Sequence, residues 1–200
     1  MKNQFQYNEA QKPAPVRIEQ VWAEKPGGGL MAETDFDVAE TTAVGYDATT
    51  KRYKPIKSAR VQKKYTKSGT SIEVDKGSGF KQGEFIGFGG EALAIGSINT
   101  GDANKDVITV TGGFKLKDIE VGEHIYQAAA AANGTDAFAA PVYAPKYIVS
   151  DGDPSATNGV VAFANNGDTP VRLINGANVR KETAAFGEDI AALIPGVNLV

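Results

Sequence analysis

The chain has 200 residues, of which 42% are apolar and 22% are charged, and its net charge is −3. This length corresponds to one large domain or two small ones and is enough to build a core without disulfides. Because the sequence has no cysteine, disulfide frameworks, thiolate metal sites and cysteine nucleophiles are excluded. His124 is the single histidine, which excludes a multi-histidine metal site within one chain.

No targeting or membrane segment is predicted. Residues 1–20 lack the apolar segment of about 7–15 residues that a secretory signal needs. The five alanines of residues 128–132 fall far short of the roughly 18–20 apolar residues of a membrane span. We therefore expect a protein that is made in a cytoplasm and has no membrane partner.

Residues 1–57 are predicted to form an extended arm. Pro13 and Pro15 flank an alanine, and Pro26 precedes three glycines, so both places favour extended chain or a turn. Only a short strand is expected between these breakers, within residues 16–22.

The charges of residues 31–67 separate into two blocks. Acids alone occur from Met31 to Thr50, and eight cations without an acid follow from Lys51 to Lys67. Such blocks are typical of interaction arms, so the cations are predicted to contact an acidic partner surface. The alternative is a solvated strand. The candidate interface consists of Arg52, Lys54, Lys57, Arg60, Lys63 and Lys64.

Nucleic acid is not the expected partner of these cations. Tyr53 and Tyr65 lie among them, an arrangement that nucleic-acid grooves also show. The neighbouring acidic block and the negative net charge oppose that interpretation. Pairing with the acidic block of a neighbouring subunit is the simpler hypothesis.

From about residue 70 the pattern predicts β-strands. Apolar or alternating segments are separated by Gly, Asn and Asp turns, which favours a sandwich or barrel over alternating strands and helices. The predicted strands are 70–74, 84–88, 92–98, 106–111, 124–126, 146–149, 160–164 and 170–174. Residues 126–133 are ambiguous, because alanine favours helix and the context favours strand.

One short C-terminal helix is predicted over residues 187–194. Glu188 and Asp189 lie in its first turn, and Pro195 and Gly196 end it. The predicted fold class is therefore all-β, with one or more sandwich or barrel-like modules, an extended N-terminal arm and a short C-terminal helix. The predicted division is an arm over 1–57, a β-rich domain over 58–145, and a β-rich part over 146–200 that is separate from or continuous with that domain.

Glycine-rich and acidic loops give no ligand motif. Residues 77–96 hold seven glycines, but their spacing matches neither phosphate-binding pattern, so hairpin turns are predicted. Loops starting at Asp102 and Asp151 resemble calcium loops, but both lack the glycine at loop position six and the glutamate at twelve. Turn-capping residues are the preferred interpretation.

No catalytic residue, metal site or cofactor is predicted. His124 alternates with apolar positions, which favours a structural or exposed histidine over a general base. The 24 acids leave a carboxylate pair open, but nothing in the sequence marks one.

Three segments carry a resemblance to a known family. They are 70–86 (TSIEVDKGSGFKQGEFI), 106–111 (DVITVT) and 178–183 (NVRKET). The region from about residue 58 to 200 resembles the head fiber and capsid-decorating proteins of tailed bacteriophages that infect Bacteroides, including crAss-like phages. The resemblance implies a non-enzymatic virion protein seated as a trimer on the capsid exterior. It carries over no functional residues and leaves the first 57 residues unmatched.

The expected function is therefore that of a structural virion protein whose extended arm, residues 1–57, docks on the capsid. Its expected partners are the major capsid protein or another capsid-surface protein, together with further copies of the chain. The alternative is a glycan-binding β-sandwich that attaches to host polysaccharide, although only 8% of the residues are aromatic. A carboxylate-based hydrolase is the least favoured class.

Overall fold

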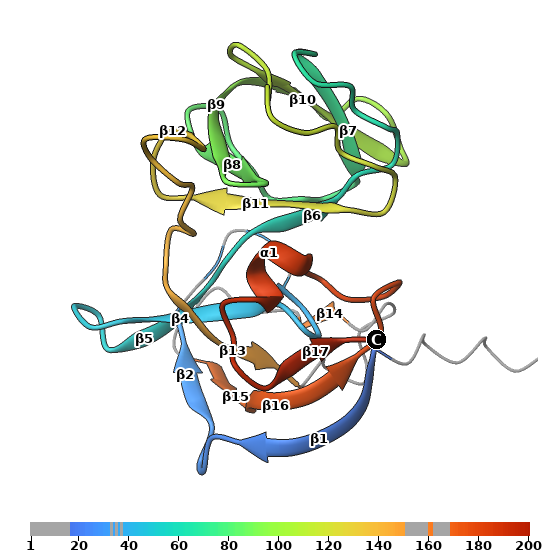
Figure 1. The fold of residues 1–200 in the computed structure, drawn as a ribbon. Coiled ribbons are helices and arrows are strands. Elements are labelled where there is room, and N and C mark those ends of the chain that lie inside the picture. Colours follow the sequence, from blue (N-terminus) through green and yellow to red (C-terminus); the bar gives the residue numbers. More distant parts are fainter. Residues whose placement is uncertain (1–16, 33, 35, 37, 151–159, 162–168) are drawn as a thin grey trace, which may run out of the picture.

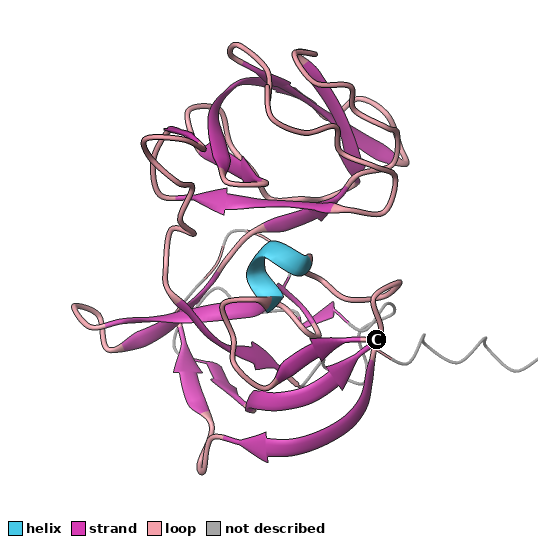
Figure 2. Cartoon of the chain, viewed as in Figure 1, coloured by secondary structure: helices cyan, strands magenta, loops and turns pink. Residues whose placement is uncertain are grey.

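The computed structural model describes residues 17–32, 34, 36, 38–150, 160–161 and 169–200. Nearly all of the described secondary structure is β, as Figure 2 shows, so the predicted all-β class is confirmed. The predicted C-terminal helix is confirmed as a single short element, α1 (Glu188–Ala191). Its N-cap, Gly187, provides no side-chain hydrogen bond, so the helix forms one turn only.

Most strands belong to two sheets. The first sheet has the order β1-β16-β13-β4-β5-β2-β15, with β17 parallel to β16. Its strands are β1 (Ile18–Glu24), β2 (Gly29–Met31), β4 (Ala43–Asp47), β5 (Arg52–Pro55), β13 (Pro145–Val149), β15 (Thr169–Val171), β16 (Leu173–Val179) and β17 (Val197–Leu199). A separate short pair joins β3 (Val38–Ala39) to β14 (Val160–Val161).

The second sheet has the order β6-β11-β8-β9-β10-β7, and β12 pairs with β9. It curves around its own core above the first sheet (Figure 1). Its strands are β6 (Ser58–Arg60), β7 (Ser71–Asp75), β8 (Phe85–Phe88), β9 (Glu91–Asn99), β10 (Lys105–Val110), β11 (His124–Ala128) and β12 (Ala132–Asn133).

The chain forms the second sheet in one continuous segment and the first sheet in two. Residues 58–133 supply every strand of the second sheet, whereas β1–β5 and β13–β17 supply the first sheet and the short pair. The predicted boundaries near 58 and 145 fall where the chain passes between sheets, at the starts of β6 and β13. We call residues 58–133 the second unit and the rest of the described chain the first unit. The second unit is therefore inserted into the first.

The N-terminal segment differs from the predicted extended arm. Residues 18–24, 29–31, 38–39, 43–47 and 52–55 form β1–β5, and β4 lies inside the first sheet between β13 and β5. Pro26, which suggested an arm, lies between β1 and β2 instead, and Pro55 ends β5. Residues 1–16 of the predicted arm lie outside the described residues.

The predicted strands from residue 70 to 149 are confirmed, whereas the single strand predicted over 170–174 is two strands, β15 and β16, separated at Arg172. The ambiguous segment 126–133 contributes to β11 and β12, so its alanines are in strands and turns. Of the predicted strand 160–164, only β14 (Val160–Val161) is described. Sequence reasoning missed six strands that are short or carry charged residues: β2, β3, β4, β5, β6 and β17.

One apolar core joins the two sheets. Ile148 and Ile174 contribute from the first sheet, and Tyr126 contributes from the second. Phe186, Ile190 and Ile194 of the C-terminal segment belong to the same cluster, and α1 lies between the sheets in Figure 1. The Gly89 amide also donates to the Asp189 carboxylate over 2.8 Å. The C-terminal segment therefore holds the two sheets together.

Removal of residues 1–57 is expected to lower the midpoint of unfolding strongly, because the first sheet loses β1, β2, β4 and β5. The deletion takes away β4 and β5 and uncovers Ile148, which is fully buried. Far-UV circular dichroism during urea unfolding measures the effect. Deletion of residues 1–16 is the matched control, because it removes no described strand, and it is expected to keep the wild-type transition. A cooperative transition of wild-type midpoint in residues 58–200 would contradict this account.

Candidate functional site

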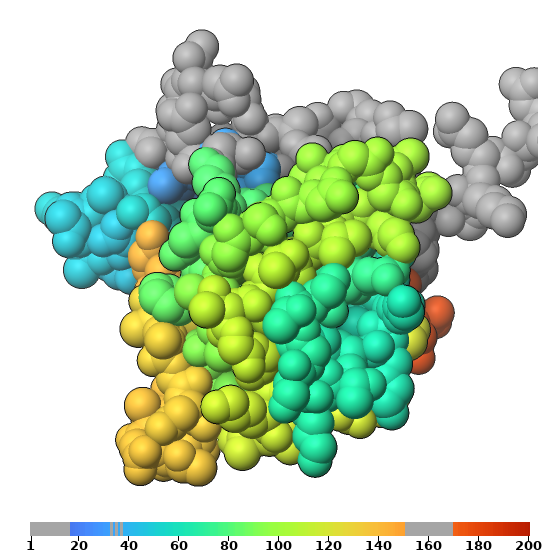
Figure 3. Space-filling view, turned by 90° about the horizontal axis from the view of Figure 1, so that it is seen from above, coloured from blue at the N-terminus to red at the C-terminus, as the bar shows by residue number. Residues whose placement is uncertain are grey.

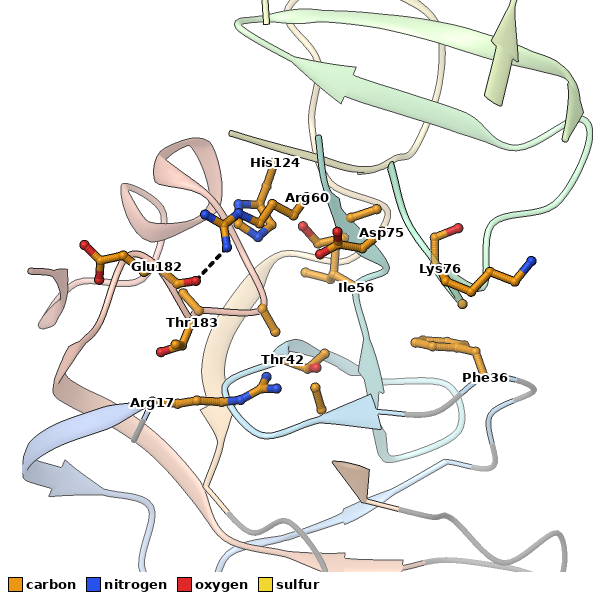
Figure 4. Close-up of a pocket in the computed structure, with 17 residues that line it drawn as sticks. Arg17, Phe36, Thr42, Ile56, Arg60, Asp75, Lys76, His124, Glu182 and Thr183 are labelled. Atoms are coloured by element: carbon orange, nitrogen blue, oxygen red, sulfur yellow. Dashed lines mark hydrogen bonds between the residues drawn. The ribbon is translucent and has the colours of Figure 1, made fainter. Parts of the chain in front are cut away.

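A polar cavity of about 480 Å³ lies at the junction of the two sheets (Figure 4). One wall of the cavity comes from the first sheet and includes Arg17, which precedes β1, and Thr42, which precedes β4. The second sheet contributes Arg60 on β6, Asp75 on β7 and His124 on β11. The C-terminal segment closes the cavity with residues 182–185. Three parts of the chain that are distant in sequence therefore meet here.

Two arginines of the cavity bind backbone carbonyls. The Arg60 guanidinium donates to the Glu182 carbonyl over 2.8 Å, and the Arg17 guanidinium donates to the Glu40 carbonyl over 3.2 Å. Each bond joins segments distant in sequence, so these charges orient the walls against one another. Arg60 belongs to the predicted interface, but in the structure it holds the C-terminal segment.

Thr41 adds a further bond at the junction. Its hydroxyl accepts the Ala185 amide over 2.9 Å, and its own amide donates to the Val149 carbonyl over 2.8 Å. Its φ of 72° is a left-handed conformation that β-branched residues rarely adopt. The surrounding bonds therefore hold a strained turn against the C-terminal segment.

His124 is the first residue of β11 and pairs with Arg60 across the sheet. Only 8% of the residue is exposed. Burial, together with the charge of Arg60, lowers the pKa of His124 to about 4, against the opposing influence of Asp75 and a backbone hydrogen bond to Ala184. The ring is therefore neutral at pH 7, and it occupies a structural position.

Ser58 does not form a nucleophile–base pair with His124. Ser58 lines the same cavity, but its hydroxyl donates to the Ile125 carbonyl over 2.9 Å. A serine nucleophile would instead need to donate its proton to the imidazole. The hydrogen bond of Ser58 therefore joins β6 to β11 at the wall of the cavity.

The turn after β7 is fixed by a buried carboxylate. Asp106 accepts Lys76 Nζ over 2.9 Å and the Gly77 amide over 3.0 Å. Asp102 lies in one of the two loops that resemble calcium sites. Its carboxylate accepts a hydrogen bond from the Asn104 amide over 2.8 Å, so its turn-capping role is confirmed. The second such loop, at Asp151, lies outside the described residues.

The cationic run does not form one patch. Lys57 is buried and pairs with Glu84 of the second unit over 2.6 Å, while Lys54 pairs with Asp47 across the β4–β5 hairpin over 2.7 Å. The Arg52 guanidinium donates to the Lys51 carbonyl over 3.2 Å. These cations therefore have partners within their own chain, which the sequence could not reveal because Glu84 is distant in sequence.

Lys63 and Lys64 are the most exposed members of the run that form ion pairs. Lys63 lies 3.2 Å from Glu73, and Lys64 lies 2.5 Å from Glu120. Both pairs lie at the surface, where such pairs stabilise a fold by less than about 1 kcal/mol. Their role at an interface stays a prediction.

Sequence reasoning missed the feature that stands out on the first sheet. β1 is its terminal strand, and Val21 and Trp22 on it are about half exposed. The indole lies against Gly176 of β16, where an added Cβ would be 2.6 Å from its nitrogen. The signal in the sequence was the only tryptophan of the chain, placed in a short predicted strand.

Comparison with known proteins gives no relative: no family model, no curated protein and no solved structure matches this chain. Across the described ranges, no helix combines the length and the apolar character needed to cross a membrane. Within the same ranges, no group of three or more His, Asp or Glu side chains is arranged to hold a metal ion.

The buried His124 is expected to make stability depend on pH. Its pKa is about 4 in the fold and 6.5 in the unfolded chain, so the unfolded state binds more protons between these values. Its contribution is therefore complete above pH 6.5 and is lost as the pH falls towards 4, by about 3 kcal/mol in total. The measurement is the free energy of unfolding by urea at pH 7 and at pH 4.

His124→Gln is the control for the carboxylates that titrate in the same range. The variant retains an amide donor but has no titrating ring. The difference in unfolding free energy between wild type and His124→Gln should change by about 3 kcal/mol between the two pH values. A difference that stays constant would show that His124 is not buried as a neutral ring.

Proposed function

We propose that this protein is a structural component of a tailed-phage particle, on the capsid exterior, that acts by protein–protein binding and self-association rather than by catalysis. The phage setting follows from the resemblance of residues 58–200 to head fiber and capsid-decorating proteins. The mode of action is supported by one observation, the exposed terminal strand β1. The proposed partners are further copies of the chain, as a trimer, and the major capsid protein or another capsid-surface protein.

β1 has the properties of an association edge. It is seven residues long and pairs with β16 on one side, while its other side ends the sheet. Terminal strands present unpaired backbone groups, and proteins usually protect them with charge or with irregular pairing. The pairing of β1 is irregular, but Val21 and Trp22 are still exposed on it, and aromatic residues are the ones that most often dominate binding interfaces.

The acids of β1 offer little protection against association. Glu19 pairs with Arg180 over 2.6 Å, and Glu24 pairs with Arg172 over 2.7 Å. Each negative charge is thus balanced by a cation of its own sheet. The pairing of β1 with β16 shifts register at three places, so the edge is not flat. We therefore place the centre of the contact on the side chain of Trp22.

The rigid attachment of β1 supports the same mode of action. β16 pairs with β1, and its residues Ile174, Ala177 and Val179 belong to the core that joins the two sheets. An interface on such a frame loses little conformational entropy when it forms. The association surface is therefore preorganised in the unbound protein.

Trp22→Ser is expected to weaken self-association roughly tenfold or more, because exposed aromatic anchors carry much of the binding energy of an interface. Analytical ultracentrifugation over a range of protein concentrations measures it. Val121→Ser removes a more exposed apolar side chain from the second unit and serves as the matched control. A monomeric wild type, or equal association of Trp22→Ser and wild type, would reject β1 as the interface.

The phage setting has its own test. Immunogold labelling of particles of the phage that encodes the chain should place the label on the outer surface of the capsid. Absence of the chain from those particles would contradict the proposed location and leave the self-association result to be judged separately.

A further inference from the structure

A groove of about 450 Å³ lies where the β1–β2 turn meets the β4–β5 hairpin. The turn contributes Lys25 and residues 27–30, and the hairpin contributes Tyr46, Lys51 and Tyr53. Seen from above, the hairpin (cyan) projects to one side of the second unit (Figure 3). The groove is separate from the cavity between the sheets and from β1's exposed side chains.

Glycines form one wall of this groove because the backbone approaches its neighbours closely there. Gly28 has a φ of 60°, and an added Cβ would overlap the Val171 carbonyl oxygen. A Cβ on Gly29 would lie 2.5 Å from the Tyr53 ring. The part of the wall at Gly28 and Gly29 is therefore bare backbone, and a side chain at either position would meet its neighbours.

The floor of the groove is a supported aromatic surface. Tyr46 and Tyr53 are directly opposite across the β4–β5 ladder, and their ring centroids are 5.2 Å apart. Tyr53 is buried and packs edge-on against Tyr147 at 5.7 Å. Burial, with the neighbouring Tyr147 and Tyr46, raises the pKa of Tyr53, so its hydroxyl stays protonated. The Tyr46 ring is 49% exposed and thus rests on a fixed neighbour.

The groove is cationic. Among the described residues that line it, the charged side chains are Lys25 and Lys51, and none is a carboxylate. Lys25 Nζ lies 6.0 Å from the centre of the Tyr53 ring and donates to the Gly28 carbonyl. Asp47, next to Tyr46 in the chain, is paired with Lys54, and that hydrogen bond holds its pKa well below the usual range. Its charge is therefore already balanced.

The backbone of Lys51 is in the left-handed conformation, which favours glycine. Its φ is 56°, a left-handed value that glycine adopts freely and that costs other residues about 1–2 kcal/mol. A charged side chain is thus held at a strained position beside the groove. Strain of this kind clusters at binding sites.

We propose that this groove binds an acidic sugar of a polysaccharide. The apolar C–H face of a pyranose ring packs on the exposed face of Tyr46, and its carboxylate lies near Lys51 and Lys25. A half-exposed aromatic ring, two cations and an open backbone wall fit a flat, anionic ligand of one or two sugar units. Single-stranded nucleic acid needs several stacking rings along a cationic track, whereas the groove exposes one ring.

This inference does not depend on the proposed phage location or on β1. The test is a titration of the full chain with a trimer of galacturonate, followed by NMR shifts of backbone amides. Shifts are expected around Tyr46, Lys51 and Gly29, and a neutral trimer of galactose should bind more weakly by roughly threefold or more. Equal binding of the two trimers, or no binding, would overturn the proposal. Tighter binding of oligodeoxythymidylate would assign the groove to nucleic acid instead.

Two variants separate binding from folding. Tyr46→Ala should weaken galacturonate binding roughly tenfold, because the stacking surface is lost. Lys51→Gly should weaken it about threefold while the urea midpoint rises or stays unchanged, because glycine relieves the left-handed strain. Phe138→Ala and Lys67→Gln, which remove an exposed ring and an exposed cation elsewhere, should bind as wild type does. Wild-type affinity in Lys51→Gly would contradict the proposal even if Tyr46→Ala failed to fold.

Discussion

The apolar contact between the C-terminal segment and both sheets is the interaction on which the rest of the structure depends. Phe186, Ile190 and Ile194 are each about 1% exposed and lie in one core with residues of both sheets. Burial of side chains of this size stabilises a fold by roughly 1.5–3 kcal/mol each. Without this contact, the first sheet would expose Ile148 and Ile174, and the second would expose Tyr126.

Polar groups at the same junction set its geometry. Apolar packing is not directional, whereas the bonds of Arg60 to Glu182, Thr41 to Ala185 and Gly89 to Asp189 each fix one position. His124 completes the junction as a buried neutral ring. The cavity between the sheets therefore results from the way in which the C-terminal segment joins the two units. These polar groups form the hydrogen bonds that join them.

The sequence allowed good predictions where local pattern determines the structure. The segment 106–111 is rich in β-branched residues between Asn104 and Gly112, and it forms β10, whose Ile108 and Val110 lie in the core of the second sheet. The helix at Glu188 was likewise marked by acids at its start and by Pro195 after its end. In these two segments, residues close in sequence are enough to predict the secondary structure.

The prediction failed where distant residues decide. β4 and β5 were assigned to an arm because charges and prolines surround them, but pairing with β13 and β2 places them inside a sheet. The cations at 51–67 were grouped as one surface, and their partners Glu84, Glu73 and Glu120 come from strands and loops that the fold brings close. The exposure of Trp22 and the approach of Gly29 to Tyr53 also depend on this tertiary arrangement.

The proposed binding surfaces share one rigid frame. β1 is fixed to β16, and the β4–β5 hairpin is fixed to β13, so both belong to the first sheet and are supported by its cores. The second unit is inserted between β5 and β13 and shares one apolar core with that sheet. A frame of this kind can present an association edge and a ligand groove at the same time, because neither needs the other to form.

The most direct test of this arrangement is hydrogen exchange of the Phe186→Ala variant, read separately for peptides of β4 and β16 and for peptides of β8 and β10. Truncation of a buried phenylalanine costs about 3–5 kcal/mol, and because the ring belongs to the core that joins both sheets, peptides of both sheets should lose protection together. Phe138→Ala, whose ring is 72% exposed, should leave both unchanged. Wild-type protection of β8 and β10 in Phe186→Ala would contradict the claim that the C-terminal segment unites the two sheets.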